Sequence, residues 1–292
     1  AYNAPNTFFI DNGKVKYGPY QDTYKDLLVE LNKWYKEGLL DNNFMGIDSK
    51  IVDSSMTNGQ AGATIGALGG GIGKWTAAAT EEGYELAGAP FPVVNRGEKS
   101  MFSARQNVVP GFGAAISTHC KDVEAAMKFL DYAYSDEGHM LMNFGIEGES
   151  YKMENGYPKY TELVTKNPDG ESMANVLSRY VRASGIGAFV QDKRYIEQYS
   201  SLPEQQAAIK TWSDTDTEKH LMPPITPSSD LSAEFSKIIN ECTTFIDEYT
   251  LKFITGSISF DEWDNYIAQL KAFNIDRAIE IYQQTYDEYQ GK

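Results

Sequence analysis

The stretch Ile254–Tyr282, "ITGSISFDEWDNYIAQLKAFNIDRAIEIY", carries the clearest structural signals of this 292-residue chain. Ser259 and Glu262 match the S-x-x-E capping box, which predicts that an amphipathic helix begins there. A further set of apolar residues at helical spacing predicts a last helix; its members are Ile275, Ile279, Tyr282, Tyr286 and Tyr289. The C-terminus is therefore expected to be helical and to pack through these apolar faces.

Apolar stripes at helical spacing also occur upstream, and they predict further core helices. The stripe before the quoted stretch comprises Phe235, Ile238, Ile239, Cys242, Phe245, Ile246 and Tyr249. The stripe nearest the N-terminus comprises Leu27, Leu31, Trp34 and Tyr35, with Gly38 as the predicted C-terminal cap. The stripe in the middle comprises Val123, Ala126, Met127, Leu130 and Ala133, and Ser135 is expected to open a second helix after it.

Strand signals are shorter and lie between these helices. Asn12-Gly13, within Phe8–Pro19, is the dipeptide most typical of a tight β-hairpin. Apolar runs at 61–67, 84–94 and 111–117 predict further short strands. Strands interspersed with helices indicate an α/β chain with an excess of helix.

Composition limits the function. Net charge is −15, and a chain this acidic is a poor partner for nucleic acid, because nucleic-acid affinity depends on Lys and Arg at the phosphates. Aromatic residues make up 13%, with 19 Tyr, and such rings suit amphipathic ligands such as sugars. The alternative is that these rings simply pack helices. No apolar run has the length that a bilayer requires.

Catalytic and metal-binding motifs are absent from the sequence. The three histidines lie in no H-E-x-x-H pattern, no G-x-S-x-G occurs, and two isolated cysteines disfavour a zinc site. "DTDTE", Asp214–Glu218, begins like a calcium loop, but Lys219 stands where the loop needs Gly. We therefore expect no cofactor and no metal, and we interpret this segment as a solvated turn.

"GQAGATIGALGGGIGKW", 59–75, contains seven glycines and raises the question of a phosphate loop. A P-loop needs Gly five residues before Gly73, where Leu68 stands, and Ser or Thr after Lys74, where Trp75 stands. The dinucleotide pattern G-x-G-x-x-G also fails. Two interpretations remain: close approach of the backbone to a ligand, or a plain loop with a core tryptophan.

Two stretches carry a resemblance to a known family. They are "KFLDYAYSDEG", Lys128–Gly138, and the quoted Ile254–Tyr282. The pieces around them are, in chain order, "YKEGLLD", "MTNGQAGATIGA", "YELAGAPFPVV" and "GFGAAIS". Over nearly its whole length the chain resembles the family 1 extracellular solute-binding proteins of bacterial ABC transporters, and it looks closest to Gram-positive lipoproteins that serve saccharide uptake.

This resemblance implies a helix-rich α/β fold of the periplasmic-binding-protein type II, like that of maltose-binding protein. The chain matches the C-terminal portion of such a protein, mostly the second lobe plus part of the first. Residues 1–88 and 147–292 are expected in the second lobe and 89–146 in the first. A half-built first lobe should expose apolar surface. Cys120 and Cys242 would lie in different lobes, so no disulfide is expected between them.

The implied function is non-catalytic: a substrate-binding component of an ABC importer that binds an oligosaccharide or other carbohydrate in an interlobe cleft. The implied partners are the sugar and the permease subunits in the membrane, and the chain is expected to be monomeric. It would lie outside the cell, held by a lipid anchor on an N-terminal part absent from this sequence. A glycan-active hydrolase, and a sensor or structural module, remain as alternatives.

The resemblance also implies ligand-binding residues. Gly70 and Gly71 would let the backbone approach the ligand, and Trp75 would stack on a sugar ring. Tyr151 follows "GIEGES" beside the expected hinge, where the alternative is hinge packing. Further implied candidates are Arg105 and Gln106 of the loop "SARQN", which would bind hydroxyls or a uronate unless the loop is plain surface, and Phe112, Phe189 and Tyr195.

Overall fold

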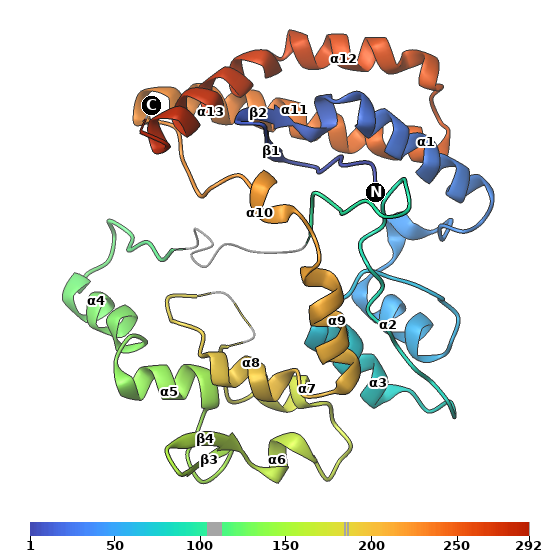
Figure 1. The fold of residues 1–292 in the computed structure, drawn as a ribbon. Helices are drawn as coiled ribbons and strands as arrows, with labels where there is room; N and C mark the ends of the chain where they lie inside the picture. The colour runs from blue at the N-terminus through green and yellow to red at the C-terminus, as the bar shows by residue number, and fades with distance from the viewer. Residues whose placement is uncertain (104–112, 184, 186, 292) are drawn as a thin grey trace. The chain divides into compact units, whose positions relative to one another are not determined.

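The computed structural model describes residues 1–103, 113–183, 185 and 187–291 (Figure 1). The chain forms two compact units, each assembled from segments that are far apart in sequence. Unit 1 comprises Ala1–Ile47, Pro90–Pro110 and Ser213–Lys292, and unit 2 comprises Asp48–Ala89 and Gly111–Trp212. The assignment of 1–88, 89–146 and 147–292 to lobes stays a prediction.

Unit 1 combines one hairpin with helices. Its strands are β1 (Phe8–Asp11) and β2 (Lys14–Tyr17). Its helices are α1 (Asp22–Lys36), α10 (Thr217–His220), α11 (Ser229–Thr255), α12 (Trp263–Ala272) and α13 (Ile275–Tyr289), with short 3-10 turns η1 (Gly18–Tyr20), η2 (Phe44–Gly46) and η4 (Phe260–Glu262).

The hairpin of unit 1 confirms the prediction made from Asn12-Gly13. The two strands are antiparallel, with Phe8 opposite Tyr17 and Ile10 opposite Val15. Asn12 has a φ of 51° and Gly13 a φ of 77°, the pair of positive values that a two-residue turn of type I′ requires. This turn matches the twist of the strands and fixes their register, so that the paired Phe8, Tyr17, Ile10 and Val15 share one face.

The core of unit 1 lies where the hairpin, α1, α11, α12 and α13 meet (Figure 1). The predicted stripe of α11 is confirmed: Ile238, Cys242 and Ile246 are buried there. The capping Ser259 is also confirmed, since its Oγ accepts a hydrogen bond from the backbone N–H of Asp261. In α13, Ile275 is fully buried at the start, whereas Tyr289 at the end is exposed.

The predicted stripe of α1 is confirmed in part, because Leu31 and Tyr35 pack against the core of unit 1 but Trp34 does not. Tyr24, Leu28 and Asn32 are the buried residues, while Trp34 is 41% exposed. The reason is a polar side chain on the inner face. Asn32 Nδ2 donates to the backbone oxygens of Phe253 and Ile254, both at 3.0 Å, and so satisfies carbonyls at the C-terminal end of α11. Gly38 lies just past the helix with a φ of 72°, as predicted.

Unit 2 contains a second hairpin, β3 (Tyr151–Glu154) with β4 (Tyr157–Tyr160), which turns at Asn155-Gly156. Its helices are α2 (Ser49–Thr57), α3 (Lys74–Ala78), α4 (Val123–Tyr132), α5 (Asp136–Phe144), α6 (Glu162–Thr165), α7 (Met173–Leu177), α8 (Lys193–Tyr199) and α9 (Pro203–Ser213), with a helical turn η3 (Leu68–Gly73) of π type. The core gathers around Phe144, Tyr160 and Leu177.

Three predicted strands are not formed. Residues 61–67, 84–94 and 113–117 contain no strand in the structure, and Ile65 is 100% exposed. An extended segment becomes a strand only when a neighbouring strand pairs with its backbone. Among the described residues, the strands pair only within the two hairpins, so no strand pairs with these segments.

Helix α4 forms as predicted, but of its predicted stripe only Ala133, just past the end of the helix, is buried. Ser135 caps the following helix α5 through its Oγ, as expected. By contrast, Val123 and Met127 are more than half exposed, and Phe129 is 78% exposed. The exposed apolar surface that the resemblance implied for this region is therefore observed.

The two cysteines lie in different units. Cys242 is a fully buried free thiol in unit 1, and Cys120 is a half-buried free thiol in unit 2. Burial raises the pKa of the Cys242 thiol to about 11. Among the described helices, none combines the length and the apolar character that crossing a membrane requires.

Candidate functional site

The glycine-rich turn is shaped by aromatic rings of its own unit. A Cβ on Gly69 would overlap the ring of Tyr199, and one on Gly66 would lie 2.9 Å from the ring of Trp75. Gly71 is buried, and a Cβ on it would lie 3.1 Å from the Cα of Gly66. Close packing thus explains why glycine stands at these three positions. By contrast, Gly70 faces open space, with no atom within 4 Å of a Cβ built on it.

Trp75 anchors this turn to α2. The ring is 6% exposed, and its Nε1 donates to Oδ1 of Asp53 at 2.7 Å. The same carboxylate forms an ion pair with Lys74. Hydrogen bonds from Lys74 and then Trp75 lower the pKa of Asp53. The ring therefore packs inside unit 2 and offers no open face to solvent in this structure.

The predicted tyrosines also lie in the core of unit 2. Tyr151 is 6% exposed and lies 5.8 Å from Phe144, measured between ring centroids. Tyr195 is 1% exposed and stacks on Tyr199 at 5.2 Å. Since Tyr199 covers Gly69, these contacts bring α8 onto the glycine-rich turn. Burial raises the pKa of Tyr151 and of Tyr199.

The remaining predicted residues differ in position. Phe189 is half-buried, in a segment that lies between α7 and α8. Arg105, Gln106 and Phe112 lie outside the described residues. The structure thus groups Gly71, Trp75 and Tyr195 around the turn and its neighbour α8, whereas no contact places Phe189 among them. Whether any of these residues binds a ligand stays a prediction.

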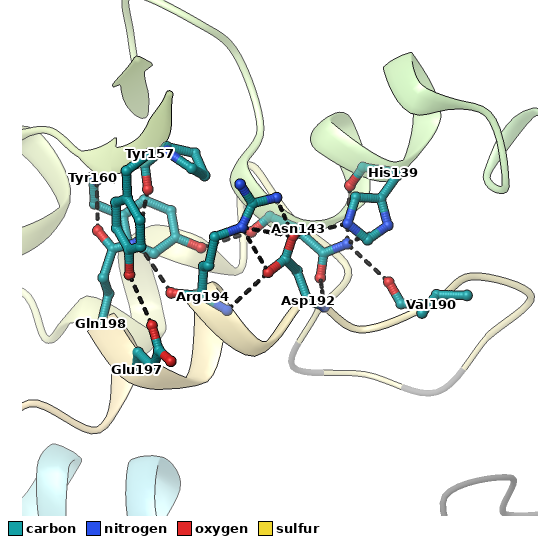
Figure 2. Close-up of polar contacts among 10 residues, drawn as sticks. His139, Asn143, Tyr157, Tyr160, Val190, Asp192, Arg194, Glu197 and Gln198 are labelled. Atoms are coloured by element: carbon teal, nitrogen blue, oxygen red, sulfur yellow. Dashed lines mark hydrogen bonds and ion pairs between the residues drawn. The ribbon is translucent and has the colours of Figure 1, made fainter. Parts of the chain in front are cut away.

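A polar cluster between α5 and α8 was not predicted (Figure 2). At its centre Asn143 is fully buried. Its Nδ2 donates to the backbone oxygens of His139 and Val190, both at 2.9 Å, and its Oδ1 accepts from the backbone N–H of Asp192 at 2.7 Å. Its backbone oxygen accepts from the hydroxyl of Tyr160 at 2.6 Å. The polar groups of this buried asparagine are thus satisfied.

Asp192 is the charged member of the cluster. Its carboxylate accepts from Arg194, with Oδ2 2.6 Å from Nη2, and lies 2.9 Å from Nε2 of His139. It also caps α8 by accepting from the backbone N–H of Arg194. The Arg194 guanidinium first, and His139 after it, hold the pKa of this carboxyl well below its usual range, although burial opposes the shift.

A second row of contacts ties α8 to the hairpin β3–β4 (Figure 2). Gln198 accepts from the backbone N–H of Tyr160 at 2.9 Å and donates to the backbone oxygen of Pro158. The hydroxyl of Tyr157 donates to Glu197 at 3.1 Å. These contacts hold α5, α8 and the hairpin as one block, and they perform no chemistry by themselves. Only the i,i+4 spacing of His139 and Asn143 was visible as a sequence signal.

The carboxylates of "DTDTE" are engaged by lysines. Asp214 forms an ion pair with Lys99, and Asp216 lies 3.0 Å from Nζ of Lys219. Across the described part of the chain, no group of three His, Cys, Asp or Glu side chains is arranged to hold a metal ion.

Comparison with known proteins shows a similarity to one family. Residues 1–140 match the sequence profile of the bacterial extracellular solute-binding proteins. Over 170 residues the chain is 25% identical to lipoprotein LipO of Bacillus subtilis. The aligned part is 57% of this chain and 33% of LipO. The resemblance expected from the sequence is therefore confirmed.

Solved structures extend the similarity to the fold. The alginate-binding protein AlgQ2 aligns with a TM-score of 0.82 and 26% identity, over 96% of this chain and 57% of AlgQ2. The substrate-binding protein FusA of S. pneumoniae was solved with kestose. It aligns with a TM-score of 0.71 and 18% identity, over 97% of this chain and 57% of FusA. The type II fold is confirmed, and the chain spans little more than half of each of these proteins.

Proposed function

Because the chain is similar in sequence to the bacterial extracellular solute-binding proteins and has their type II fold, we propose that it is the substrate-binding component of an ABC importer and binds an oligosaccharide. The observation that carries this proposal is the alignment with the alginate-binding protein, which covers 96% of this chain at a TM-score of 0.82. That protein is named for a polysaccharide ligand. No bond of the ligand is made or broken in this proposal.

The chemistry of the chain supports a carbohydrate over other solutes. A sugar presents C–H faces that pack on flat rings and hydroxyls that bind planar polar side chains. Unit 2 presents both kinds of group at least partly to solvent: the half-buried ring of Phe189, and the polar side chains of His139 and Arg194, which are 28% and 36% exposed. A net charge of −15 disfavours nucleic acid as an alternative ligand.

The site residues of the proposal follow from exposure. Gly70 and Phe189 are accessible, so we place them among the direct contacts. Trp75, Tyr151 and Tyr195 are buried and would support the binding surface from behind unless a change of conformation exposes them. Arg105, Gln106, Phe112 and Gly71 remain in the proposed set on the resemblance alone.

The proposed cycle needs two further elements. Ligand binding would close two lobes around a cleft, and the closed form would dock on the permease subunits in the membrane. The protein would work as a monomer outside the cell, attached by a lipid anchor that lies outside this sequence.

A thermal-shift experiment on the full chain tests the proposal. Alginate tetrasaccharide, kestose and maltotetraose would be titrated to several hundred micromolar, with glucosamine 6-phosphate and glutamine as non-matching solutes. A ligand present at about 100 times its Kd stabilises the fold by about 2.7 kcal/mol, which raises the melting temperature measurably. We expect at least one oligosaccharide to do so. Chromatography of the recovered sugar separates binding from hydrolysis, since fragments would indicate a glycan-active enzyme.

A further inference from the structure

The chain on either side of Val190 is fastened to unit 2 by hydrogen bonds, and Figure 2 shows those that Asn143 makes. The backbone N–H of Arg182 donates to the oxygen of Met142 at 2.9 Å. Nε2 of Gln191 donates to the backbone oxygen of Ala183. Asn143 then holds both the oxygen of Val190 and the N–H of Asp192. Two points of the chain, near 183 and near 191, are thus fixed against α5.

The side chain that holds this segment is the fully buried amide of Asn143. Burying a polar side chain costs free energy unless hydrogen bonds compensate, and Asn143 obtains them mostly from backbone groups of its surroundings. Asn143 thus fixes the backbone of this surface segment at Val190 and Asp192. Segments of this kind, positioned by a rigid scaffold, are where binding residues concentrate.

The fixed segment presents apolar side chains at the surface. Val190 is 55% exposed and Phe189 is half-buried, although neither gains from contact with water. The backbone N–H of Phe189 donates to the oxygen of Gly187 at 3.0 Å, which forms a tight turn before the ring. Figure 2 shows Val190 and His139 on the same side of Asn143.

The neighbouring polar cluster also brings polar side chains to the surface. Asp192 binds both His139 and Arg194, and the side chains of His139 and Arg194 are about one quarter to one third exposed, at 28% and 36%. Imidazole and guanidinium groups are planar donors that suit sugar hydroxyls. An aromatic or aliphatic surface beside planar donors is the combination by which proteins recognise saccharides.

We propose that Gly187–Gln191 is a saccharide-contacting segment, with Phe189 and Val190 as its apolar contacts and Asn143 as the positioning residue that holds it. This inference rests on the proposed function and deepens it. Asn143 touches no ligand in this account; it acts through the backbone of Val190 and Asp192. The contact surface belongs entirely to unit 2.

The test compares three single variants of the full chain. Phe189→Ala and Val190→Ser remove the apolar contacts. Phe129→Ala is the matched control, because Phe129 is also an exposed aromatic of unit 2 but lies on α4. Titration calorimetry would use whichever of alginate tetrasaccharide, kestose or maltotetraose binds the unaltered chain. We expect Phe189→Ala to weaken binding about fivefold to twentyfold, Val190→Ser somewhat less, and Phe129→Ala not at all.

The positioning role of Asn143 is tested by a measurement that a purely structural role would not change. Hydrogen exchange of the unaltered chain should slow at the amides of 187–191 when the saccharide binds. Asn143→Ala should speed exchange at the Asp192 amide and weaken binding. If this variant does not fold, the exchange data on the unaltered chain and the two contact variants still decide the question.

The outcomes separate the inference from the function on which it rests. If the unaltered chain binds a saccharide while Phe189→Ala and Val190→Ser bind it equally well, with no protection at 187–191, the inference is overturned and the proposed function stands. If the unaltered chain binds none of the three saccharides, both are overturned. Equal loss of binding in Phe129→Ala would also contradict the inference, because it would show a general effect of losing a surface ring.

Discussion

The backbone of Gly69 lies so close to the ring of Tyr199 that a Cβ on residue 69 would overlap three atoms of the phenol. The adjacent Gly70 has no atom within 4 Å of the same position. Neither glycine is among those with positive φ. Packing against Tyr199 therefore excludes a side chain at position 69, whereas the neighbouring position 70 has room for one.

Gly69→Ala should destabilise the chain by about 2 kcal/mol, because the methyl group forces the Tyr199 ring or the backbone to move. Gly70→Ala is the matched control and should change the free energy of unfolding by less than about 1 kcal/mol in either direction. Urea unfolding followed by circular dichroism measures both. Equal effects of the two substitutions would contradict the packing assignment.

Asp53 should matter mainly as the acceptor for a buried indole. Asp53→Ala leaves Nε1 of Trp75 without its partner and should cost about 2 kcal/mol. Asp53→Asn keeps an acceptor and loses the charge opposite Lys74, so it should cost about half as much, since that pair is partly in solvent. If both variants were as stable as the unaltered chain, the hydrogen bond would not fix the turn.

Asp192 should make stability depend on pH. Its folded-state pKa is lowered by Arg194 and His139, so the carboxylate stabilises the fold above its unfolded pKa of about 3.9 and this contribution disappears as pH falls through the folded value. Asp192→Asn should therefore lose about 2 kcal/mol at pH 7, an amount limited by the partly exposed guanidinium. The difference between variant and unaltered chain should shrink below pH 4.

The control for this prediction is Asp214→Asn. Asp214 and Lys99 form an ion pair in which both side chains are more than half exposed, so its loss should have no measurable effect at any pH. Urea unfolding at pH 3, 4, 5 and 7 would compare the three proteins. A difference between the Asp192 variant and the unaltered chain that stayed constant across this range would argue against the lowered pKa.

Much of the fold could be predicted because its signals are local. The Asn12-Gly13 turn, the Ser135 and Ser259 caps and the stripe of α11 each depend on residues within a few positions of one another. Prediction failed where a distant partner decides the structure. Asn32 is buried because α11 ends beside it, and Ile65 is exposed because no described strand pairs with its segment.

The candidate site shows the same limit. The resemblance implied Trp75 and Tyr151 as ligand contacts, with core or hinge packing as the alternatives, and each ring packs inside unit 2. Asn143 and Asp192 are 49 positions apart and belong to no motif, so their hydrogen bond could not be seen in the sequence. Asp192 itself looks like any acid that precedes a helix.

Helix α4 should tolerate polar substitution despite its apolar stripe. Met127→Gln should change the free energy of unfolding by less than about 0.5 kcal/mol, because Met127 is more than half exposed. Ile246→Ala in α11 is the comparison and should cost about 3 kcal/mol, because Ile246 is fully enclosed. Thermal unfolding by calorimetry measures both. A large loss in the Met127 variant would mean that α4 is packed in solution.

The most direct test of carbohydrate binding is isothermal titration of alginate tetrasaccharide and of kestose into the full chain. The account predicts a saturable 1:1 heat for at least one oligosaccharide, with the sugar recovered intact afterwards. The absence of any saturable heat, or recovery of the sugar as fragments, would contradict it.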